Sequence, residues 1–416
     1  MLPGLSGSNN TATTGIFGGT VANNGVGWVQ DVGNVLIDTV SFEIGGQQID
    51  RQYGQWLEIY SQLSLTEEKL LGYNEMVGHW RTRAGAIENS VYSKFYYVPL
   101  MFYWNLFVGL SLPLIALQYH EVRILFEFAQ FGALVKAFPG TGQTATAFPP
   151  NSSTASNTNI SINLYIDYIY LDTAERRRFA QMAHEYLITQ LQLTNFQLTT
   201  QGVQNLTFNF NHPCKFLAWV AQLNSATNSD ATTDAKYNEW FNFSNLPPNV
   251  SGVALSGYYG NPGDLLGPYV TGQVGMPTNN GNDCTILLNG QQIFAARPIN
   301  YFRLVQPFLH FTRVPRKHIY VYSFALRPEE HQPSGTINFS RIDNSQLAVY
   351  FSNQIPAGTS AASQLFLYAV NYNVLRIMSG MGKKSKLPVK ATRYNYLGPN
   401  YRKSFEFPIN KLVRVY

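Results

Sequence analysis

Charged side chains are scarce in this sequence of 416 residues. Asp, Glu, Lys and Arg make up 13% of it, less than the 14% contributed by Phe, Tyr and Trp. A freely soluble monomer normally carries more charge, so we expect partners to cover much of the surface. The net charge of +5 is localised, because the last 34 residues hold nine Lys or Arg and one acid. A confined basic tail favours a solvated or partner-contacting extension over a general nucleic-acid surface.

Cysteine is almost absent. Cys214 and Cys284 cannot make a disulfide framework for a chain this long. Both lie in segments with alternating apolar residues, which predicts buried free thiols and fits a reducing compartment. The N-terminus has neither the charged region nor the apolar core of a secretory signal, so none is expected.

Catalytic motifs are missing as well. No Gly-rich phosphate loop follows a strand, and Gly-x-Ser-x-Gly, Cys-x-x-Cys and His-x-x-x-His spacings do not occur. His120-Glu121, at the expected start of a strand, is interpreted as a surface pair rather than an acid–base unit. We therefore predict that the protein is not an enzyme and has no catalytic, cofactor-binding or metal-binding residues and no cofactor. The scattered histidines are His79, His120, His184, His212, His310, His318 and His331.

One run of residues imitates a membrane span. Residues 95–119, 25 in all, contain no Asp, Glu, Lys or Arg, and such a length could cross a bilayer as a helix. Pro99, Asn105 and Pro113 interrupt it, and aromatic residues are dense in it. We therefore predict strands and a loop or short helix, buried under a neighbouring subunit.

The most informative feature that is present is a long-range duplication. Residues 40–49 return 244 positions later as residues 284–293, and in each copy alternating apolar residues lead into a Gly-Gln-Gln turn. Alternation before a tight turn predicts a half-buried strand entering a hairpin. The chain is thus expected to contain a duplicated β module.

Three further pairs of segments repeat in the same order. They are residues 94–98 and 317–321, residues 122–126 and 347–351, and residues 162–166 and 365–369. The period is far longer than the roughly 20–50 residues of solenoid repeats, so two whole domains are predicted. Frequent Gly, Asn, Thr and Pro between short apolar stretches favour an all-β sandwich for each.

A connecting helix is predicted over residues 172–188. Asp172 or Thr173 can cap its start, and Glu175 complements the positive end of the helix dipole. Residues 179, 182, 183 and 186 would form one apolar stripe. The triplet at residues 176–178, three arginines, could bind phosphate, but a connector between the two modules is the preferred interpretation.

Four segments together resemble one protein family. They are residues 45–57, which contain Gly-Gly-Gln-Gln-Ile-Asp, and residues 95–100, 172–187 and 375–382. They are similar to the major capsid proteins of nucleocytoplasmic large DNA viruses, the group that contains phycodnaviruses and iridoviruses. The resemblance covers about residues 28–382, roughly 85% of the chain. It implies two tandem eight-stranded jelly-roll sandwiches, a double jelly roll, with short connecting helices.

The resemblance also implies a function. The protein is expected to be a structural major capsid protein whose homotrimer forms a pseudo-hexagonal capsomer and tiles the icosahedral shell of a large double-stranded DNA virus. Implied partners are its own copies, neighbouring capsomers and minor capsid proteins. Whether an internal membrane below the shell is also a partner is left open by the resemblance. Sequence-specific nucleic acid is not implied. The expected location is the virion capsid, assembled in the host cytoplasm, with outward loops at residues 138–159 and 224–282.

The implied domains are residues 1–190 for the first jelly roll and residues 191–382 for the second, followed by a basic tail at residues 383–416. Family members begin with strands before the equivalent of Gly27-Trp28-Val29, but here only a leader rich in Gly, Asn and Thr stands there. The chain therefore departs from the family at its start.

The missing opening strands have a counterpart at the other end of the chain. Phe-x-Phe, a short turn, Lys and an apolar run open the second module at residues 208–220, and the same pattern occurs at residues 405–416. One hypothesis is that residues 400–416 supply the first strands of jelly roll one, as in a circular permutant. The alternative is an independent basic arm that docks on a neighbour or lies under the shell.

Other functions remain to be weighed. A glycan-binding jelly roll would need an exposed aromatic platform beside acids, for which Tyr237, Trp240 and Phe241 near Asp230 and Asp234 are candidates. An enzyme of the cupin type would need clustered His and Glu ligands, which the histidine spacing does not offer. A minor capsid component is closer kin, but such proteins usually carry one jelly roll.

Overall fold

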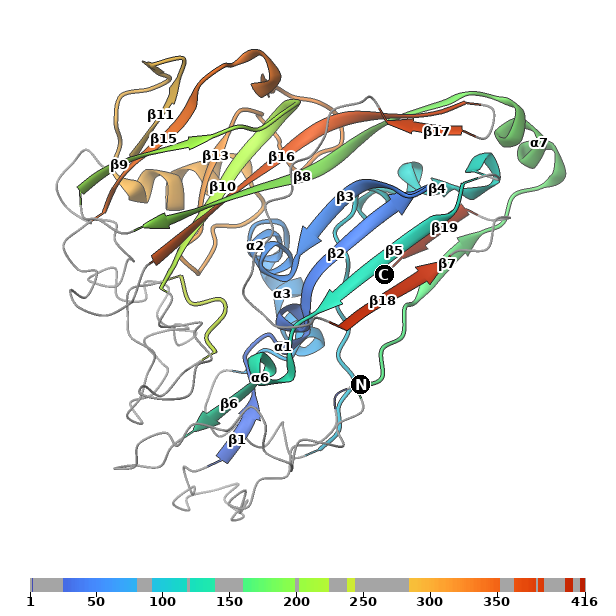
Figure 1. Cartoon of the computed structure of the whole chain (residues 1–416), viewed down its shortest axis with the longest axis horizontal. Helices are drawn as coiled ribbons and strands as arrows, with labels where there is room; N and C mark the ends of the chain where they lie inside the picture. Colours follow the sequence, from blue (N-terminus) through green and yellow to red (C-terminus); the bar gives the residue numbers. More distant parts are fainter. Residues whose placement is uncertain are drawn as a thin grey trace.

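The structure is a computed structural model that describes residue 2 and residues 25–80, 92–117, 120–138, 160–198, 202–223, 238–243, 284–351, 363–378, 381–384, 401–406 and 412–415. These ranges hold two β sandwiches side by side, with α2 (Gly54–Ser64) and α3 (Glu67–Val77) where they meet (Figure 1). The outward loops predicted over residues 138–159 and 224–282 lie almost wholly outside the described residues.

The first sandwich has two small sheets. Their strands are β2 (Ile37–Ile44), β3 (Gln47–Tyr53), β4 (Leu112–Pro113), β5 (Val122–Phe128), β7 (Ile166–Ile169), β18 (Tyr401–Glu406) and β19 (Leu412–Val415). One sheet has the order β18-β5-β2-β3 and the other β4-β19-β7. Alternate residues of β5 are buried, as expected for a strand with one face on a core. That core includes the stacked rings of Phe102 and Trp104, whose centroids lie 5.2 Å apart.

The second sandwich repeats this plan with longer strands. They are β8 (His184–Leu198), β9 (Gly202–Phe208), β10 (Pro213–Leu223), β11 (Cys284–Leu288), β12 (Gln291–Gln292), β13 (Tyr320–Ser323), β14 (Ile337–Asn338), β15 (Ser345–Phe351), β16 (Ser363–Met378) and β17 (Met381–Lys384). One sheet has the order β12-β11-β15-β9 and the other β13-β10-β16-β17, with β8 paired to β16 and β14 to β10. Trp219, Phe302 and Tyr320 fill the core between them.

The duplicated hairpins form as predicted. Gly45 and Gly46 link β2 to β3, and Asn289 and Gly290 link β11 to β12. All four residues have positive φ, between 50° and 82°, which is the conformation that a two-residue hairpin turn requires and that Gly and Asn tolerate best. The duplication is less complete elsewhere: residues 320–323 form β13, whereas residues 94–98 form only an isolated bridge at Lys94.

One ribbon joins the two sandwiches. β8 and β16 pair along 15 residues, from Ser363 opposite Leu198 to Ile377 opposite His184. Near one end, Leu198 and Leu365 belong to the second core, and near the other, Ile188 and Ile377 belong to the first. The division between the domains therefore runs through a continuous pair of strands.

Shorter elements complete the described chain. They are β1 (Gly25–Trp28), which pairs with β6 (Val135–Phe138), α1 (Val32–Leu36), α5 (Tyr103–Leu106), α6 (Phe131–Leu134), α7 (Thr173–Gln181), α9 (Gln306–His310), η1 (Val108–Leu110), η2 (Leu114–Leu117), η5 (Tyr301–Val305) and η6 (Phe339–Arg341). The apolar run at residues 95–119 holds only short pieces of these. Among the described helices, none has the length and apolar character needed to cross a membrane.

The predicted connector helix is correct at its start and too long at its end. Asp172 caps α7 through its side chain, which accepts a hydrogen bond from the Glu175 backbone N–H. The helix ends at Gln181, and His184 already begins β8, so the stripe expected to continue to residue 186 is wrong. Pairing of β8 with β16 overrides the local helical periodicity.

Candidate functional site

Apolar and ionic contacts meet at the junction between the two sandwiches. A third apolar cluster fills it, with residues from α2 on one side and from β10 and β16 on the other. Trp56 of α2 lies at its centre, with ring centroids 6.3 Å from Phe216 and 5.2 Å from Tyr368. Since Trp56 is 3% exposed and Phe216 and Tyr368 are each 1% exposed, the hydrophobic effect opposes any separation of the sandwiches here.

A close approach of backbones places Trp56 there. Gly54 begins α2, and a Cβ at this position would lie only 2.1 Å from the carbonyl oxygen of Asn34 and 2.3 Å from that of Ile37. Only glycine fits such a contact. The start of α2 is therefore fixed against α1 and the start of β2.

A buried ionic network crosses the same junction. Asp31, in the left-handed conformation (φ 53°) before α1, is hydrogen-bonded with His79 Nδ1 at 2.7 Å and accepts from Lys317 Nζ at 3.1 Å. Lys317, from the second sandwich, also donates to Glu58 Oε1 of α2 at 2.7 Å. The side chains of Asp31 and Glu58 are each 2% exposed and that of Lys317 is 9% exposed. One ammonium thus bridges two buried carboxylates of the other sandwich, and His79 is the second partner of Asp31.

Neutral groups complete this network. Asn34 Nδ2 donates to Glu58 Oε2 at 3.0 Å, and Gln62 Nε2 donates to Glu58 Oε1 at 3.1 Å. A buried charge is tolerated only when it is paired and hydrogen-bonded, and the Glu58 carboxylate satisfies both conditions.

The network shifts the pKa of its members. Burial raises the pKa of the Asp31 carboxyl, but the charges of His79 and Lys317 outweigh burial and hold this pKa well below its usual range. Burial lowers the pKa of the Lys317 ammonium, whereas Glu58 and Asp31 more than reverse this and raise it above its ordinary value. Both groups are therefore ionised across the neutral range.

The end of α2 is held from the second sandwich as well. Arg313 donates through Nε to the carbonyl oxygen of Gln62 at 3.0 Å and through Nη2 to Gln62 Oε1 at 2.8 Å, and its backbone N–H donates to Leu63 O at 3.1 Å. Arg316 forms an ion pair with Glu67. A guanidinium at the carbonyl end of a helix also complements the helix dipole.

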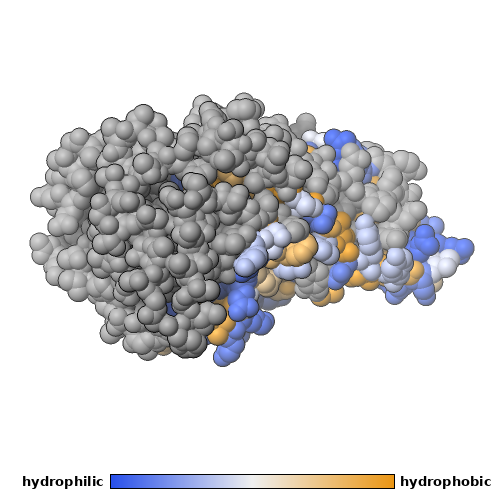
Figure 2. All heavy atoms as spheres, turned by 90° about the horizontal axis from the view of Figure 1, so that it is seen from below, coloured by the Kyte–Doolittle hydropathy of each residue, from blue (hydrophilic) through white to orange (hydrophobic). Residues whose placement is uncertain are grey.

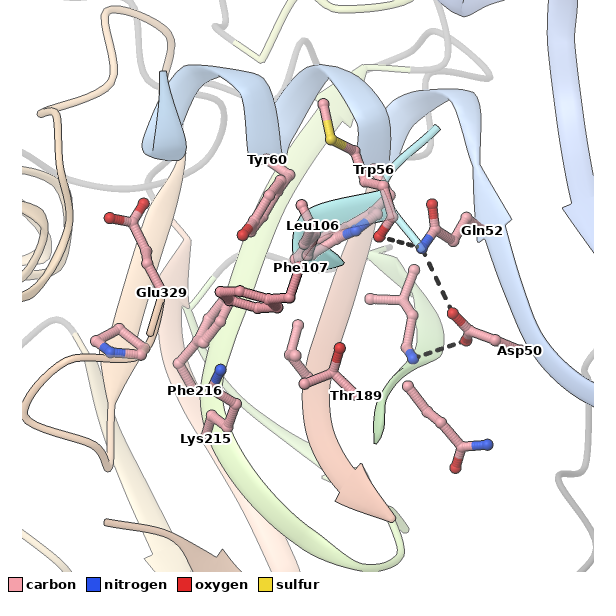
Figure 3. Close-up of a pocket in the computed structure, with 15 residues that line it drawn as sticks. Asp50, Gln52, Trp56, Tyr60, Leu106, Phe107, Thr189, Lys215, Phe216 and Glu329 are labelled. Carbon is pink, nitrogen blue, oxygen red and sulfur yellow. Dashed lines mark hydrogen bonds between the residues drawn. The ribbon is translucent and has the colours of Figure 1, made fainter. Parts of the chain in front are cut away.

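A small cavity lies in the junction beside this network. Tyr60 and Trp56 project from α2 toward Phe216 and Lys215 of β10, and Glu329 stands across the cavity from Asp50 (Figure 3). Its volume is about 30 Å³, room for about two water molecules at roughly 10–15 Å³ each and too little for an organic ligand. The Asp50 carboxylate accepts from the backbone N–H of Leu191 at 3.0 Å, so its contacts also join the sandwiches.

Two charged groups at this cavity are perturbed by burial. Burial lowers the pKa of Lys215 to about 8, and burial raises the pKa of Glu329. Lys215 Nζ donates to the carbonyl oxygen of Glu330 at 3.2 Å and lies 4.9 Å from the centre of the Tyr372 ring. Glu329 Oε2 accepts from the backbone N–H of Thr312 at 2.9 Å. These contacts hold the segment at residues 328–330 against β10 and beside Thr312.

The residues singled out by sequence are scattered over the structure. Cys214 and Cys284 are free and buried, as predicted. Glu121, beside His120, pairs with Arg123 at 2.5 Å, and its side chain is partly exposed. The arginines at residues 176–178 are exposed on α7, at the far end of the molecule from the second sandwich (Figure 1).

Two residues of the candidate glycan platform, Trp240 and Phe241, are described, and their rings do not form an exposed surface. Trp240 Nε1 donates to the carbonyl oxygen of Ala133 at 2.8 Å, and Phe241 is 7% exposed. Both rings pack in the junction cluster, where a sugar could not reach them. Tyr237, Asp230 and Asp234 lie outside the described residues.

Sequence reasoning missed the junction residues. Asp31, Glu58 and Lys317 are far apart in the chain and share no spacing, so no motif connects them. The available signal was indirect: in a sequence with 13% charged residues, a lysine three residues before the apolar strand β13 suggests a buried partner. Within the described ranges, no cluster of three or more His, Cys, Asp or Glu side chains could hold a metal ion.

Known protein families match most of the chain, from residue 6 to residue 383. The protein family described as "Large eukaryotic DNA virus major capsid protein" matches residues 175–383. The family described as "Major capsid protein N-terminus" matches residues 6–172. The chain is 38% identical to the major capsid protein of Phaeocystis pouchetii virus, covering 85% of this chain and 81% of that protein. It is 39% identical to the major capsid protein of Paramecium bursaria Chlorella virus 1, covering 83% and 78%. In solved structures, VP54 of PBCV-1 superposes with a TM-score of 0.63 at 35% identity, covering 88% of this chain and 87% of that one.

Proposed function

Because this chain belongs to the family of major capsid proteins of large eukaryotic DNA viruses, we propose that it acts as a homotrimer, each trimer being one pseudo-hexagonal capsomer of an icosahedral shell. The family membership makes the chain a capsid protein of the virion, and its two sandwiches form a double jelly roll.

The observation that carries this proposal is the buried junction. Two similar sandwiches in one chain are fixed to each other by an apolar cluster, an ionic network and the shared strands β8 and β16. Three such rigid pairs around a threefold axis present six similar units, and six units can tile a hexagonal lattice. A flexible hinge between the sandwiches would not hold the angle that such a lattice needs.

Exposed apolar residues support contacts between copies. On the second sandwich, Phe308 and Leu309 of α9 are 75% and 60% exposed and Leu326 is 72% exposed, and His310 Nδ1 bonds with Leu326 O at 3.0 Å. A cluster of large exposed apolar side chains marks a protein contact. Seen from below, the described surface carries apolar patches between the middle of the molecule and the polar end where α7 lies (Figure 2).

The remaining parts of the proposal concern domains and partners. Residues 1–190 form the first jelly roll, residues 191–382 the second, and residues 383–416 the tail, with β8 crossing the boundary. Neighbouring capsomers and minor capsid proteins contact the outer edges, and an internal membrane below the shell is a further candidate. Assembly takes place in the host cytoplasm. The alternative of a glycan-binding protein loses support because Trp240 and Phe241 are packed in the junction.

The test is the native mass of the purified chain by light scattering. We expect a stable species near three times 46.7 kDa, with a pseudo-hexagonal outline by electron microscopy. The change Phe308→Arg should shift the mass toward the monomer, because it puts a charge into an apolar contact. The matched control is Leu71→Arg on α3, where Leu71 is 55% exposed. A monomeric natural chain would overturn the proposal, and a trimer unaffected by Phe308→Arg would remove the α9 surface from it.

A further inference from the structure

The first sandwich is completed by the end of the chain. β18 pairs antiparallel with β5, and β19 lies between β4 and β7 as the central strand of the second sheet. In Figure 1 these two red strands stand among the blue and cyan strands of the N-terminal part. Within the described residues β4 and β7 have no strand partner except β19. Without the tail strands β5 would have an open edge and the opposite sheet would have no centre.

The register of the tail strands places residue types of opposite charge at paired positions. Tail residues stand directly opposite residues of the other sign in three places: Arg402 opposite Glu127, Glu406 opposite Arg123, and Arg414 opposite Asp167. In the same register, Phe405 stands opposite Ile124. Opposite charges directly across two strands stabilise the pairing and like charges destabilise it. A slip of one residue in either direction would lose all three of these pairings and offer at most Lys403 opposite Glu127 in their place, so the sequence favours this register.

The second sandwich provides an independent measure of the same positions. β9 pairs with β15 at one edge of a sheet, as β18 pairs with β5, and β15 and β5 are the equivalent strands of the duplication. The next strand, β10, runs through the centre of the opposite sheet, as β19 does in the first sandwich. The second sandwich thus takes from its own beginning the two strands that the first takes from residues 401–415.

We propose that the first sandwich contains an acceptor site for an extended peptide, formed by the edge of β5 and the gap between β4 and β7, and that β18 and β19 of the same chain are its ligand. The binding mode is strand addition, in which backbone hydrogen bonds give affinity and the opposed side chains give specificity. The 16 residues between Lys384 and Tyr401 can span about 55 Å when extended. The connection therefore acts as a tether that raises the local concentration of the tail. The proposal does not depend on the capsid role.

The first experiment cuts the tether after folding. A protease site flanked by Gly and Ser is inserted between residues 391 and 392 of the full chain, the folded protein is cleaved, and the mixture is passed over a native sizing column. We expect the tail fragment to co-elute with the body and to exchange with a labelled synthetic peptide of residues 399–416. If the fragment separates while the body keeps the unfolding midpoint of the intact chain, the acceptor site does not exist.

Charge reversal tests the specificity of the site. A peptide with Arg402→Glu and Arg414→Glu should bind the cleaved body at least tenfold more weakly, because it faces Glu127 and Asp167 with like charges. Binding should recover when the body carries Glu127→Arg and Asp167→Arg. The matched control is Arg393→Glu in a longer peptide that begins at residue 391, which changes the same charge outside both strands and should leave affinity unchanged. Equal affinity for all peptides would contradict the register.

A disulfide trap tests which copy supplies the ligand. Ser404 stands directly opposite Leu125, so Ser404→Cys with Leu125→Cys should form a bond within one chain under mild oxidation. The off-register control, Ser404→Cys with Arg123→Cys, should bond poorly. Cross-linked dimers on a denaturing, non-reducing gel would show that a second copy supplies the tail and would overturn the assignment to the same chain.

Discussion

The two sandwiches share one architecture but are closed in different ways. The second is built from strands that lie within one stretch of the chain, from β8 to β17, and its core is filled by Trp219, Phe302 and Tyr320. The first pairs β5 with β18, from nearly the other end of the chain, and keeps a cavity of about 380 Å³ beside Phe126, Ile162 and Leu164. Distant pairing makes closure slower, because chain entropy must be lost before the contacts form.

This difference gives the junction a second role. The second sandwich can form early, and its face carries Lys317, Arg313 and Phe216, which bind the α1–α2 region of the first. The junction contacts thus stabilise the first sandwich before the tail strands pair with its sheets. Stability in the first sandwich should therefore depend on the junction more than stability in the second does.

The largest loss of stability is expected when the junction lysine, Lys317, is removed. Lys317→Ala leaves the carboxylates of Asp31 and Glu58 buried without their ammonium, and breaking a buried ion pair costs about 3–5 kcal/mol. We expect the free energy of unfolding in urea at pH 7 to fall by that amount, with the first sandwich unfolding before the second. Separate tryptophan reporters, Trp104 in the first core and Trp219 in the second, distinguish the two.

The matched control for that change is a surface pair. Arg327 and Glu330 lie 3.1 Å apart, with side chains 74% and 54% exposed, so Arg327→Ala should cost less than about 1 kcal/mol. Should Lys317→Ala cost no more than Arg327→Ala, the junction would not support the first sandwich. A loss seen equally in both reporters would show that the two sandwiches unfold as one unit.

Acid, in contrast, should destabilise the second sandwich, through His318. Burial, with a smaller contribution from the Arg303 charge, lowers the pKa of His318 to about 3, whereas the unfolded chain has about 6.5. Between these values the unfolded state binds more protons, so stability falls as the pH drops through this window. Between pH 6.5 and 5 the loss should be about 1.6 kcal/mol, because the slope rises toward roughly 1.4 kcal/mol for each pH unit only below pH 6.5.

The measurement is the urea midpoint as a function of pH. His318→Gln should flatten the dependence between pH 6.5 and 5, whereas His310→Gln, at a solvent-exposed contact with Leu326 O, should leave it unchanged. Asp31 adds no loss in this range, because its lowered pKa keeps its contribution intact until the pH falls below the ordinary carboxyl range. An unchanged slope in His318→Gln would mean that the acid sensitivity has another origin.

Local chemistry explains which features were predictable. The paired hairpins follow from turn residues such as Gly46 and Gly290, and the start of α7 follows from the capping residue Asp172. The end of α7 could not be placed, because strand pairing at His184 is a tertiary effect. Trp240 was a candidate for an exposed platform in the alternative glycan-binding function, because nothing local shows that its indole meets Ala133 O. The junction charges were invisible for the same reason: their partners are brought together only by the fold.

The smallest test removes one hydroxyl from the junction. Tyr368 of β16 donates its phenolic hydrogen to Gln55 Oε1 at 2.6 Å, while its ring packs 5.2 Å from Trp56. Tyr368→Phe keeps the ring and loses the hydrogen bond, so we expect a loss of about 1 kcal/mol in urea unfolding. Tyr170→Phe, at a side chain 73% exposed, should change stability by less than about 0.5 kcal/mol. A double-mutant cycle with Gln55→Leu should return most of the roughly 1 kcal/mol as coupling energy. If the coupling energy is zero, the Tyr368–Gln55 hydrogen bond does not help to hold α2 to β16, and the apolar cluster makes that contact alone.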